Sequence, residues 1–195
     1  MNADAALRTR IDAARLRTLA WLDSMQAPGE PVGVARISAA HDPARWPGML
    51  LPGTYNAVLC RQLLGALPDE RTPLLHWLLR FRRADGIFRI PGMRAEDVFK
   101  KPDADETWRY IDWHVSNYSL GAVQALASGA VPPPDFIRPY LDPITLKAWL
   151  ADRDLRDPWQ EGNNIVNLAS FLLLLGRQAQ VDRALDILFR WHDYH

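Results

Sequence analysis

The feature that most constrains this chain is an alternation between helices that are apolar on every side and helices that are apolar on one face. Residues 54–66, 116–128 and 164–175 read as helices with almost no polar face, whereas residues 4–25 and 181–191 carry both kinds of face. A helix that is apolar all round must be buried on all sides. We therefore expect an all-α protein with two layers, in which outer helices cover inner ones.

Two residue pairs mark further helix starts. Thr72-Pro73 and Asp142-Pro143 each place a capping residue before a proline, which favours the first turn of a helix. Proline- and glycine-rich segments separate the expected helices. Residues 32–37 are the one candidate for a short strand.

The helix pairs resemble one another at regular spacing. Trp77 is followed eight residues later by Asp85, and Trp149 is followed by Asp157 at the same interval. Each apolar helix also ends near a glycine that favours a helix stop, at Gly65, Gly129 and Gly176. These repeats predict an array of outer–inner helical hairpins within a single helical-repeat domain, residues 1–195.

The segment 81–88, FRRADGIF, ends an outer helix with Phe-x-x-x-Asp-Gly-x-aromatic. It resembles the glutamine–tryptophan repeat of squalene cyclases and protein prenyltransferases, in which a Gln and a Trp around the Gly join an outer helix to the next turn. Gly86 and Phe88 match this pattern, and Arg82 stands where the Gln would be. The segment containing Gln26 and Gly29 has the Gln but no aromatic residue after it. The resemblance implies a partial α/α toroid around a central cavity.

A partial toroid leaves inner helices at an open edge. The run 171–175, Phe-Leu-Leu-Leu-Leu, lies in the last inner helix. Burying one such side chain is worth about 1.5–3 kcal/mol, so several exposed ones are costly. We therefore expect this run to be covered by a second copy of the chain in a homodimer or by a C-terminal continuation.

The string Asp103-Ala104-Asp105-Glu106 precedes the second apolar helix. It resembles the Asp-x-Asp-Asp-Thr motif of class II terpene cyclases, and this resemblance makes Asp105 a candidate catalytic acid. Such an acid must stay protonated inside a dry cavity. The same residues also fit a capping box at a helix N-terminus, and that alternative is favoured.

A polar and aromatic cluster follows and leads into residues 116–128. Asp112 and His114 are a candidate acid–base pair for catalysis. Their neighbours with large rings are candidate substrate-binding residues, namely Trp108, Trp113 and Tyr118. In the alternative interpretation, the rings fill the layer between the helices.

An equivalent lead-in occurs one repeat later, before residues 164–175. Asp157 is its candidate catalytic residue. Its candidate substrate-binding residues are Trp159, Asn163 and Asn164. The two asparagines also suit helix N-caps. Because both lead-ins fall at matching repeat positions, they are candidates to face one shared pocket.

Composition narrows the class of protein. Lys+Arg and Asp+Glu both number 23, so no net charge attracts nucleic acid, and the local arginines Arg80, Arg82, Arg83 and Arg89 read as a solvated helix end. No metal-binding spacing and no cofactor motif is present in the sequence. A signal peptide and an apolar run long enough for a membrane span are also missing, which predicts a cytoplasmic protein. The single cysteine, Cys60, fits a reducing compartment and reads as a small buried hydrophobe.

Two functions follow as hypotheses. In the first, the chain is a helical-repeat binding or assembly module without chemistry, which takes a small molecule or a glycan. In the second, it belongs to an α/α-toroid enzyme that acts on an isoprenoid or a carbohydrate in an aromatic-lined cavity. Aromatic walls stabilise carbocations and also stack on sugars, so the substrate class stays open.

Overall fold

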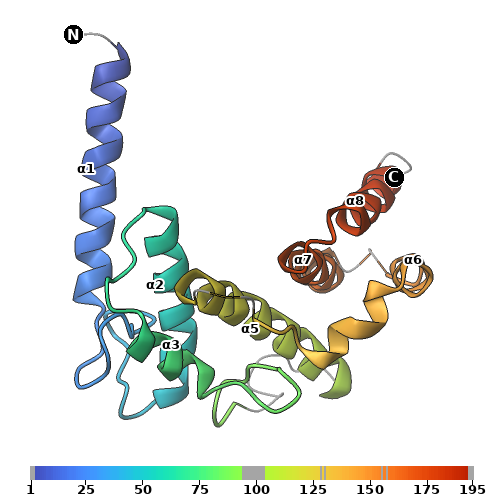
Figure 1. Cartoon of the computed structure of the whole chain (residues 1–195), viewed down its shortest axis with the longest axis horizontal. Coiled ribbons are helices and arrows are strands. Elements are labelled where there is room, and N and C mark those ends of the chain that lie inside the picture. The colour runs from blue at the N-terminus through green and yellow to red at the C-terminus, as the bar shows by residue number, and fades with distance from the viewer. Residues whose placement is uncertain are drawn as a thin grey trace. The chain divides into compact units, whose positions relative to one another are not determined.

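The computed structural model describes residues 3–192 apart from 94–103, 128, 130, 155 and 157, and its described part is helical. The elements are α1 (Ala3–Ser24), η1 (Pro47–Met49), α2 (Leu50–Leu63), α3 (Thr72–Leu79), α5 (Ala104–Leu126), η2 (Asp135–Leu141), α6 (Pro143–Ala151), α7 (Pro158–Leu174) and α8 (Gln178–His192) (Figure 1). The all-α prediction is confirmed. The strand expected at residues 32–37 is wrong: within the described residues, Ala35 makes only an isolated bridge to Gln26.

The chain forms two compact units. Unit 1 contains Met1–Phe81 and Gly121–Ala130, and unit 2 contains Arg82–Leu120 and Val131–His195. Helix α5 therefore begins in unit 2, and its last turns, from Gly121, belong to unit 1. None of the described helices is long and apolar enough to cross a membrane.

The core of unit 1 lies where the end of α1 meets α2. Leu22, Met25, Ala35 and Ala57 form a buried cluster, with Leu19 packed against it. The first two turns of α2 are largely buried, but the helix begins at Leu50 rather than at residue 54, and its last turn is largely exposed and includes Leu63 and Cys60. The prediction of a buried Cys60 is therefore wrong, because the core contacts only the N-terminal half of this helix.

Helix α1 packs only through its C-terminal turns. Leu22 is buried, whereas Leu7, Ile11 and Leu16 are more than half exposed. In Figure 1 the first turns of α1 extend beyond the other helices of unit 1. The apolar side chains predicted from the sequence are on this helix, but most of them cover no core among the residues that the structure describes.

Helix starts and stops follow local sequence signals in most places. Asp142 caps α6, since its carboxylate accepts a hydrogen bond from the Thr145 N–H at 2.9 Å. Gly65 and Gly176 adopt positive φ directly after α2 and α7, as the predicted stops require. Thr72 differs from its prediction: it is the first residue of α3 rather than the residue that caps it.

The sequence repeat is visible in the turns that follow α1 and α3. The Ala27 N–H donates to the Val34 carbonyl at 2.8 Å, and the Arg83 N–H donates to the Ile87 carbonyl at the same distance. Isolated bridges pair Gln26 with Ala35 and Arg82 with Phe88. Gln26 and Arg82 thus occupy equivalent positions. The toroid itself stays a prediction.

The core of unit 2 includes contacts of α7 with α8 and η2 and of α6 with η2 and α8, and buried residues of α5 such as Trp113 belong to it. Within the run 171–175, Phe171 and Leu172 are fully buried, while Leu173 is about half exposed. Much of this run is therefore covered inside the chain. The predicted homodimer and the predicted continuation are not needed to bury Phe171 and Leu172.

Candidate functional site

The polar and aromatic residues 108–118 lie on helix α5 rather than on a loop before it, because α5 begins at Ala104. A helix turns by about 100° per residue, so neighbours in this sequence point to different sides. Three faces of α5 therefore receive three different sets of side chains.

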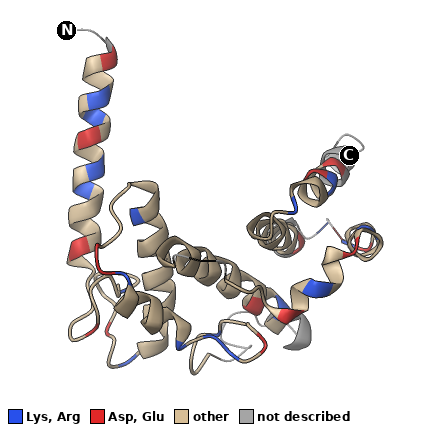
Figure 2. Ribbon diagram, in the orientation of Figure 1, with Lys and Arg blue, Asp and Glu red and all other residues tan. Residues whose placement is uncertain are grey.

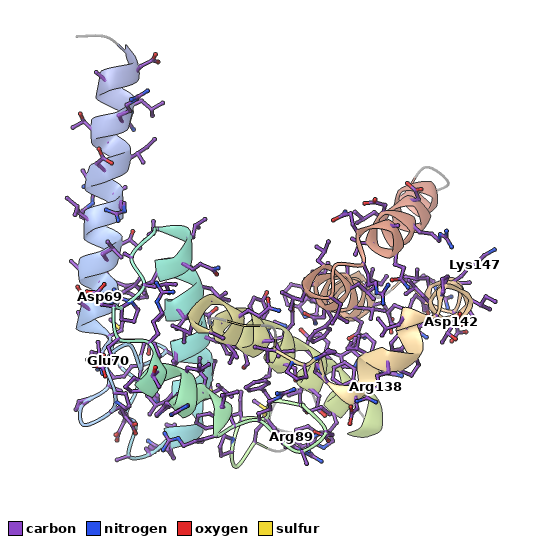
Figure 3. All side chains as sticks on the ribbon, viewed as in Figure 1. Asp69, Glu70, Arg89, Arg138, Asp142 and Lys147 are labelled. Carbon is purple, nitrogen blue, oxygen red and sulfur yellow. The ribbon has the colours of Figure 1, made fainter. Side chains whose placement is uncertain are left out.

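The first face holds an ion pair. The Arg89 Nε donates to Asp112 Oδ1 at 2.9 Å, and a second guanidinium nitrogen bonds to Oδ2 (Arg89 is labelled in Figure 3). The guanidinium also lies 4.2 Å from the centre of the Trp108 ring. Asp112 is thus held by Arg89, and Trp108 supports that arginine. Asp112 and His114, two residues apart, do not face each other.

The second face holds Trp113, which is buried among other rings. It stacks on Phe136 with 5.4 Å between ring centres, and it contacts Tyr140 and Trp149. Trp113 therefore fills the core of unit 2. This matches the alternative in which the rings pack between helices rather than the substrate-binding role.

The third face holds a ladder of rings around His114. Its imidazole lies 5.9 Å from the Tyr110 ring and 4.8 Å from the Tyr118 ring, measured between ring centres. Burial lowers the pKa of His114 and raises the pKa of Tyr110, because desolvation disfavours the charged form of each. The imidazole is therefore neutral at pH 7.

Helix α7 adds two buried asparagines, one of which bonds to Asn117 of α5. The Asn117 Nδ2 donates to Asn167 Oδ1 at 2.9 Å. Asn164 and Asn167 are 1% and 2% exposed. Among the described residues, neither Asn164 Oδ1 nor Asn167 Nδ2 has a hydrogen-bond partner. We refer to His114, Asn117, Tyr118, Asn164 and Asn167 together as the His–Asn cluster.

The sequence singled out part of this cluster. His114, Tyr118 and Asn164 were candidates there, whereas Asn117 and Asn167 were not. The spacing of Asn164 and Asn167, one turn apart within the mostly apolar segment 164–175, is the signal that identifies them. Capping by Asn163 and Asn164 is ruled out, since α7 already begins at Pro158.

The other predicted site residues lie elsewhere. Trp159 is largely exposed, and Asn163 donates from Nδ2 to the Trp159 carbonyl. Asp157 and the side chain of Asp105 lie outside the described residues. The prediction that Asp157 and Asp112 face one shared pocket therefore lies outside the described residues.

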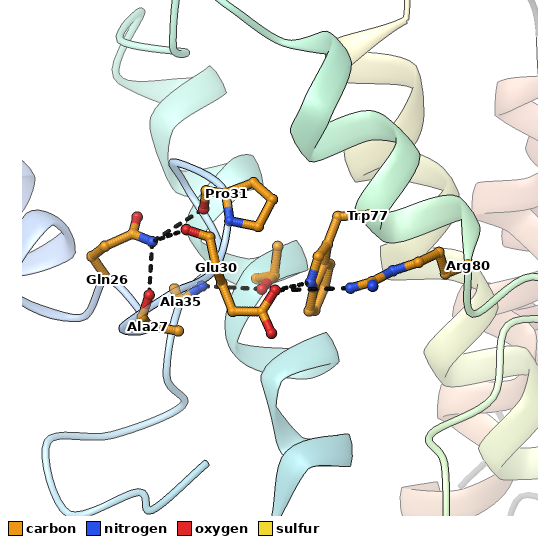
Figure 4. A network of polar contacts seen from close by, with 8 residues as sticks. Gln26, Ala27, Glu30, Pro31, Ala35, Trp77 and Arg80 are labelled. Carbon is orange, nitrogen blue, oxygen red and sulfur yellow. Dashed lines mark hydrogen bonds and ion pairs between the residues drawn. The ribbon is translucent and has the colours of Figure 1, made fainter. Parts of the chain in front are cut away.

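Unit 1 contains a pocket of about 560 Å³ beside the turn that follows α1. Its lining includes Asp23, Gln26, Glu30 and Arg61. Asp23 pairs with Arg61, and Glu30 Oε2 accepts from the Trp77 Nε1 at 2.8 Å and lies 3.8 Å from Arg80 (Figure 4). The Gln26 amide bonds to the backbone of its own turn. These groups hold the turn together and are already paired.

The arginines that read as a basic patch also have partners. Arg80 lies near Glu30, Arg83 pairs with Asp85, and Arg89 with Asp112. Arg82 donates to the Pro132 carbonyl. Within the described part of the chain, no three His, Cys, Asp or Glu side chains are grouped in a way that suits a metal ion.

Comparison with protein-family models, curated proteins and solved structures finds no match for this chain.

Proposed function

We propose that this protein is a helical-repeat binding module whose His–Asn cluster holds a small, neutral, polyhydroxylated ligand such as a glycan. The observation that carries the proposal is the pair of buried amide atoms, Asn164 Oδ1 and Asn167 Nδ2, which have no partner among the described residues.

The free-energy cost of leaving these two atoms unpaired supports the presence of a ligand that pairs with them. A buried polar group without a hydrogen bond costs about 1–3 kcal/mol. Asn164 offers an acceptor and Asn167 offers a donor. A hydroxyl group both donates and accepts, so neighbouring hydroxyls on one ligand satisfy both amides. Charged ligands fit less well, because the cluster itself contains no ionised side chain at pH 7.

The rings of the cluster suit the same ligand class. Tyr118 is exposed and its ring packs against His114. An aromatic ring and amide groups in one binding site favour a sugar, whose ring carries both C–H faces and hydroxyls. A purely apolar isoprenoid would leave the amides unpaired, so a carbohydrate fits the cluster better than an isoprenoid does.

An enzymatic role for the same cluster has one observation in its favour. His114 is neutral because burial lowers its pKa, and a neutral imidazole accepts a proton. Asp112, the candidate partner for this histidine, is held instead by Arg89. Catalysis on a bound carbohydrate would therefore require His114 to act without Asp112, and this remains the second proposal.

The test is calorimetry of the full chain with a panel of neutral oligosaccharides, repeated with Asn164→Leu and Asn163→Ala. Asn164→Leu removes the unpaired oxygen and keeps the branching of the side chain at Cγ. We expect it to abolish binding and to leave stability unchanged or raised. Asn163→Ala is the matched control, because its amide already bonds to the Trp159 carbonyl.

Two results would contradict the proposal. One is a complete panel without binding. The other is an Asn164→Leu protein that is destabilised yet binds as before, which would assign this asparagine to packing alone. Product formation from a bound oligosaccharide, lost in His114→Asn, would favour the enzymatic proposal instead.

A further inference from the structure

Helix α1 carries an exposed stripe of three large apolar residues and two small residues, with the spacing of a coiled coil. Leu7, Ile11, Ala14, Thr18 and Trp21 follow one another at alternating intervals of four and three residues. All five are exposed, and the three large ones are 55%, 57% and 53% exposed at Leu7, Ile11 and Trp21. We call these five residues the α1 stripe. In heptad notation they alternate between positions d and a.

Arginines flank the α1 stripe on both sides. Arg8 and Arg15 occupy the e positions, and Arg10 and Arg17 occupy the g positions. Figure 2 shows basic residues recurring along this helix. Arg15 also anchors α1, because its Nε donates to the Leu64 carbonyl at 2.8 Å. The other three arginines are exposed.

The acidic residues of α1 do not offset the positive charge of these flanking arginines. Asp12 and Asp23 lie on the opposite side of the helix from the α1 stripe, at the helical spacing of 100° per residue. Asp4 lies at the N-terminal end of the stripe, one turn before Leu7. The flanks that face a partner helix are therefore basic over two heptads.

We propose that α1 pairs with an acidic helix of another protein, one with apolar a and d positions and Glu or Asp at e and g. Residues at e and g set partner choice in coiled coils, and opposite charges there favour pairing. The three exposed arginines at these positions, Arg8, Arg10 and Arg17, match a partner with carboxylates. This interaction surface is separate from the His–Asn cluster.

The same arginines disfavour pairing of α1 with a second copy of the chain. In a parallel pair, g meets e of the next heptad, which places Arg10 of one copy opposite Arg15 of the other. In an antiparallel pair, g meets g and e meets e, so arginine again meets arginine. Like charges at these positions repel. This argues against a homodimer through α1.

An anionic membrane is a different class of partner, and the structure favours it less. A helix that lies on a membrane has a wide apolar face opposite a charged one. The α1 stripe is narrow, and Leu16, 62% exposed, lies on the other side of the helix beside Asp12. The narrow stripe is typical of a coiled-coil contact.

The experiment uses the full chain and two designed peptides of about four heptads, each with Ile at a and Leu at d. One peptide has Glu at e and g, and the other has Lys. Binding is measured by fluorescence anisotropy of the labelled peptides at low and high salt. We expect the Glu peptide to bind, with affinity falling as salt screens the charges, and the Lys peptide not to bind.

Variants locate the contact on α1. The double variant Arg10→Glu with Arg17→Glu is expected to lower the affinity for the Glu peptide at least about tenfold and to raise the affinity for the Lys peptide. Ile11→Ser removes an apolar contact and weakens binding of the Glu peptide. Leu16→Ser is the matched control, because Leu16 is equally exposed but outside the stripe, and it leaves binding unchanged.

Circular dichroism of each variant confirms that it is folded before binding is compared. Equal binding of the Glu and Lys peptides, or equal loss in Leu16→Ser and Ile11→Ser, would overturn the proposal. So would binding to phosphatidylserine vesicles without peptide binding. Self-association of the chain that Ile11→Ser abolishes would overturn it in favour of a homodimer, and light scattering at tens of micromolar measures that outcome.

Discussion

The backbone N–H of Phe88 donates a hydrogen bond to Ser116 Oγ at 2.9 Å, inside the core of unit 2. In unit 1, the N–H of Ala35 donates to Thr54 Oγ1 at 3.1 Å. Both hydroxyls are fully buried. Ala35 and Phe88 are also the bridge partners in the two repeated turns. In each case a turn is fastened to the next long helix by one hydroxyl group.

The first prediction concerns this repeated bond. Ser116→Ala removes the acceptor and leaves the Phe88 N–H buried without a partner. We expect the free energy of unfolding to fall by about 1–3 kcal/mol. Ser119→Ala is the matched control, because the Ser119 hydroxyl is also buried and has no partner among the described residues. Chemical denaturation measures both, and equal losses would contradict the assigned role of Ser116.

The second prediction concerns Gly86 in the turn after α3. Its φ is +83°, and an added Cβ would lie 2.8 Å from the Pro134 Cα. Gly29, in the equivalent turn after α1, has a φ of +76° and nothing within 4 Å of an added Cβ. Gly29→Ala should cost about 1–2 kcal/mol through backbone strain alone. Gly86→Ala should lower the melting temperature further, because the turn must also move away from Pro134.

The third prediction separates a structural Asp112 from a catalytic one. Asp112→Asn weakens a mostly buried ion pair with Arg89, and we expect it to reduce stability by about 1–3 kcal/mol. Asp152→Asn makes the same chemical change in a carboxylate that is almost fully exposed and pairs with Arg153. It should have little effect. Thermal melting compares them, and an Asp112→Asn protein as stable as the parent would contradict the structural role.

The fourth prediction concerns pH. Burial lowers the pKa of His114 below its ordinary value of 6.5, so the unfolded chain takes up this proton at a higher pH than the folded chain. Stability is therefore complete above about pH 6.5 and falls as the pH drops from there towards the folded pKa. We expect the melting temperature to fall as the pH is lowered below about 6.5. His114→Asn should reduce this fall, and an unchanged fall would assign it to another group.

Much of the local structure was predictable from the sequence. Asp142-Pro143 predicted the start of α6, and Gly65 and Gly176 predicted the stops of α2 and α7. These signals act within one turn of the helix, so a short stretch of chain contains all the physics they need. The prediction placed the starts of α5 and α7 too late, because polar residues on both helices read as loops.

The candidate site was predictable only in part. Asp112 and His114 are close in the sequence, yet Asp112 pairs with Arg89, which is 23 residues away. Asn117 and Asn167 are 50 residues apart, and their hydrogen bond depends on how α5 meets α7. Residue types show which groups need partners, but the partner of each group is set by contacts that are distant in the sequence.

The burial of side chains is likewise determined in part by the sequence and in part only by the tertiary structure. The sequence by itself determined that the chain is helical and which faces of its helices are apolar, because hydrophobic periodicity reflects the geometry of a single helix. Only the tertiary structure decided that Phe171 is buried while Ile11 and Cys60 are exposed. The reason is that burial depends on which surfaces the folded chain brings together, and an apolar stripe has the same pattern whether it covers a core or faces solvent.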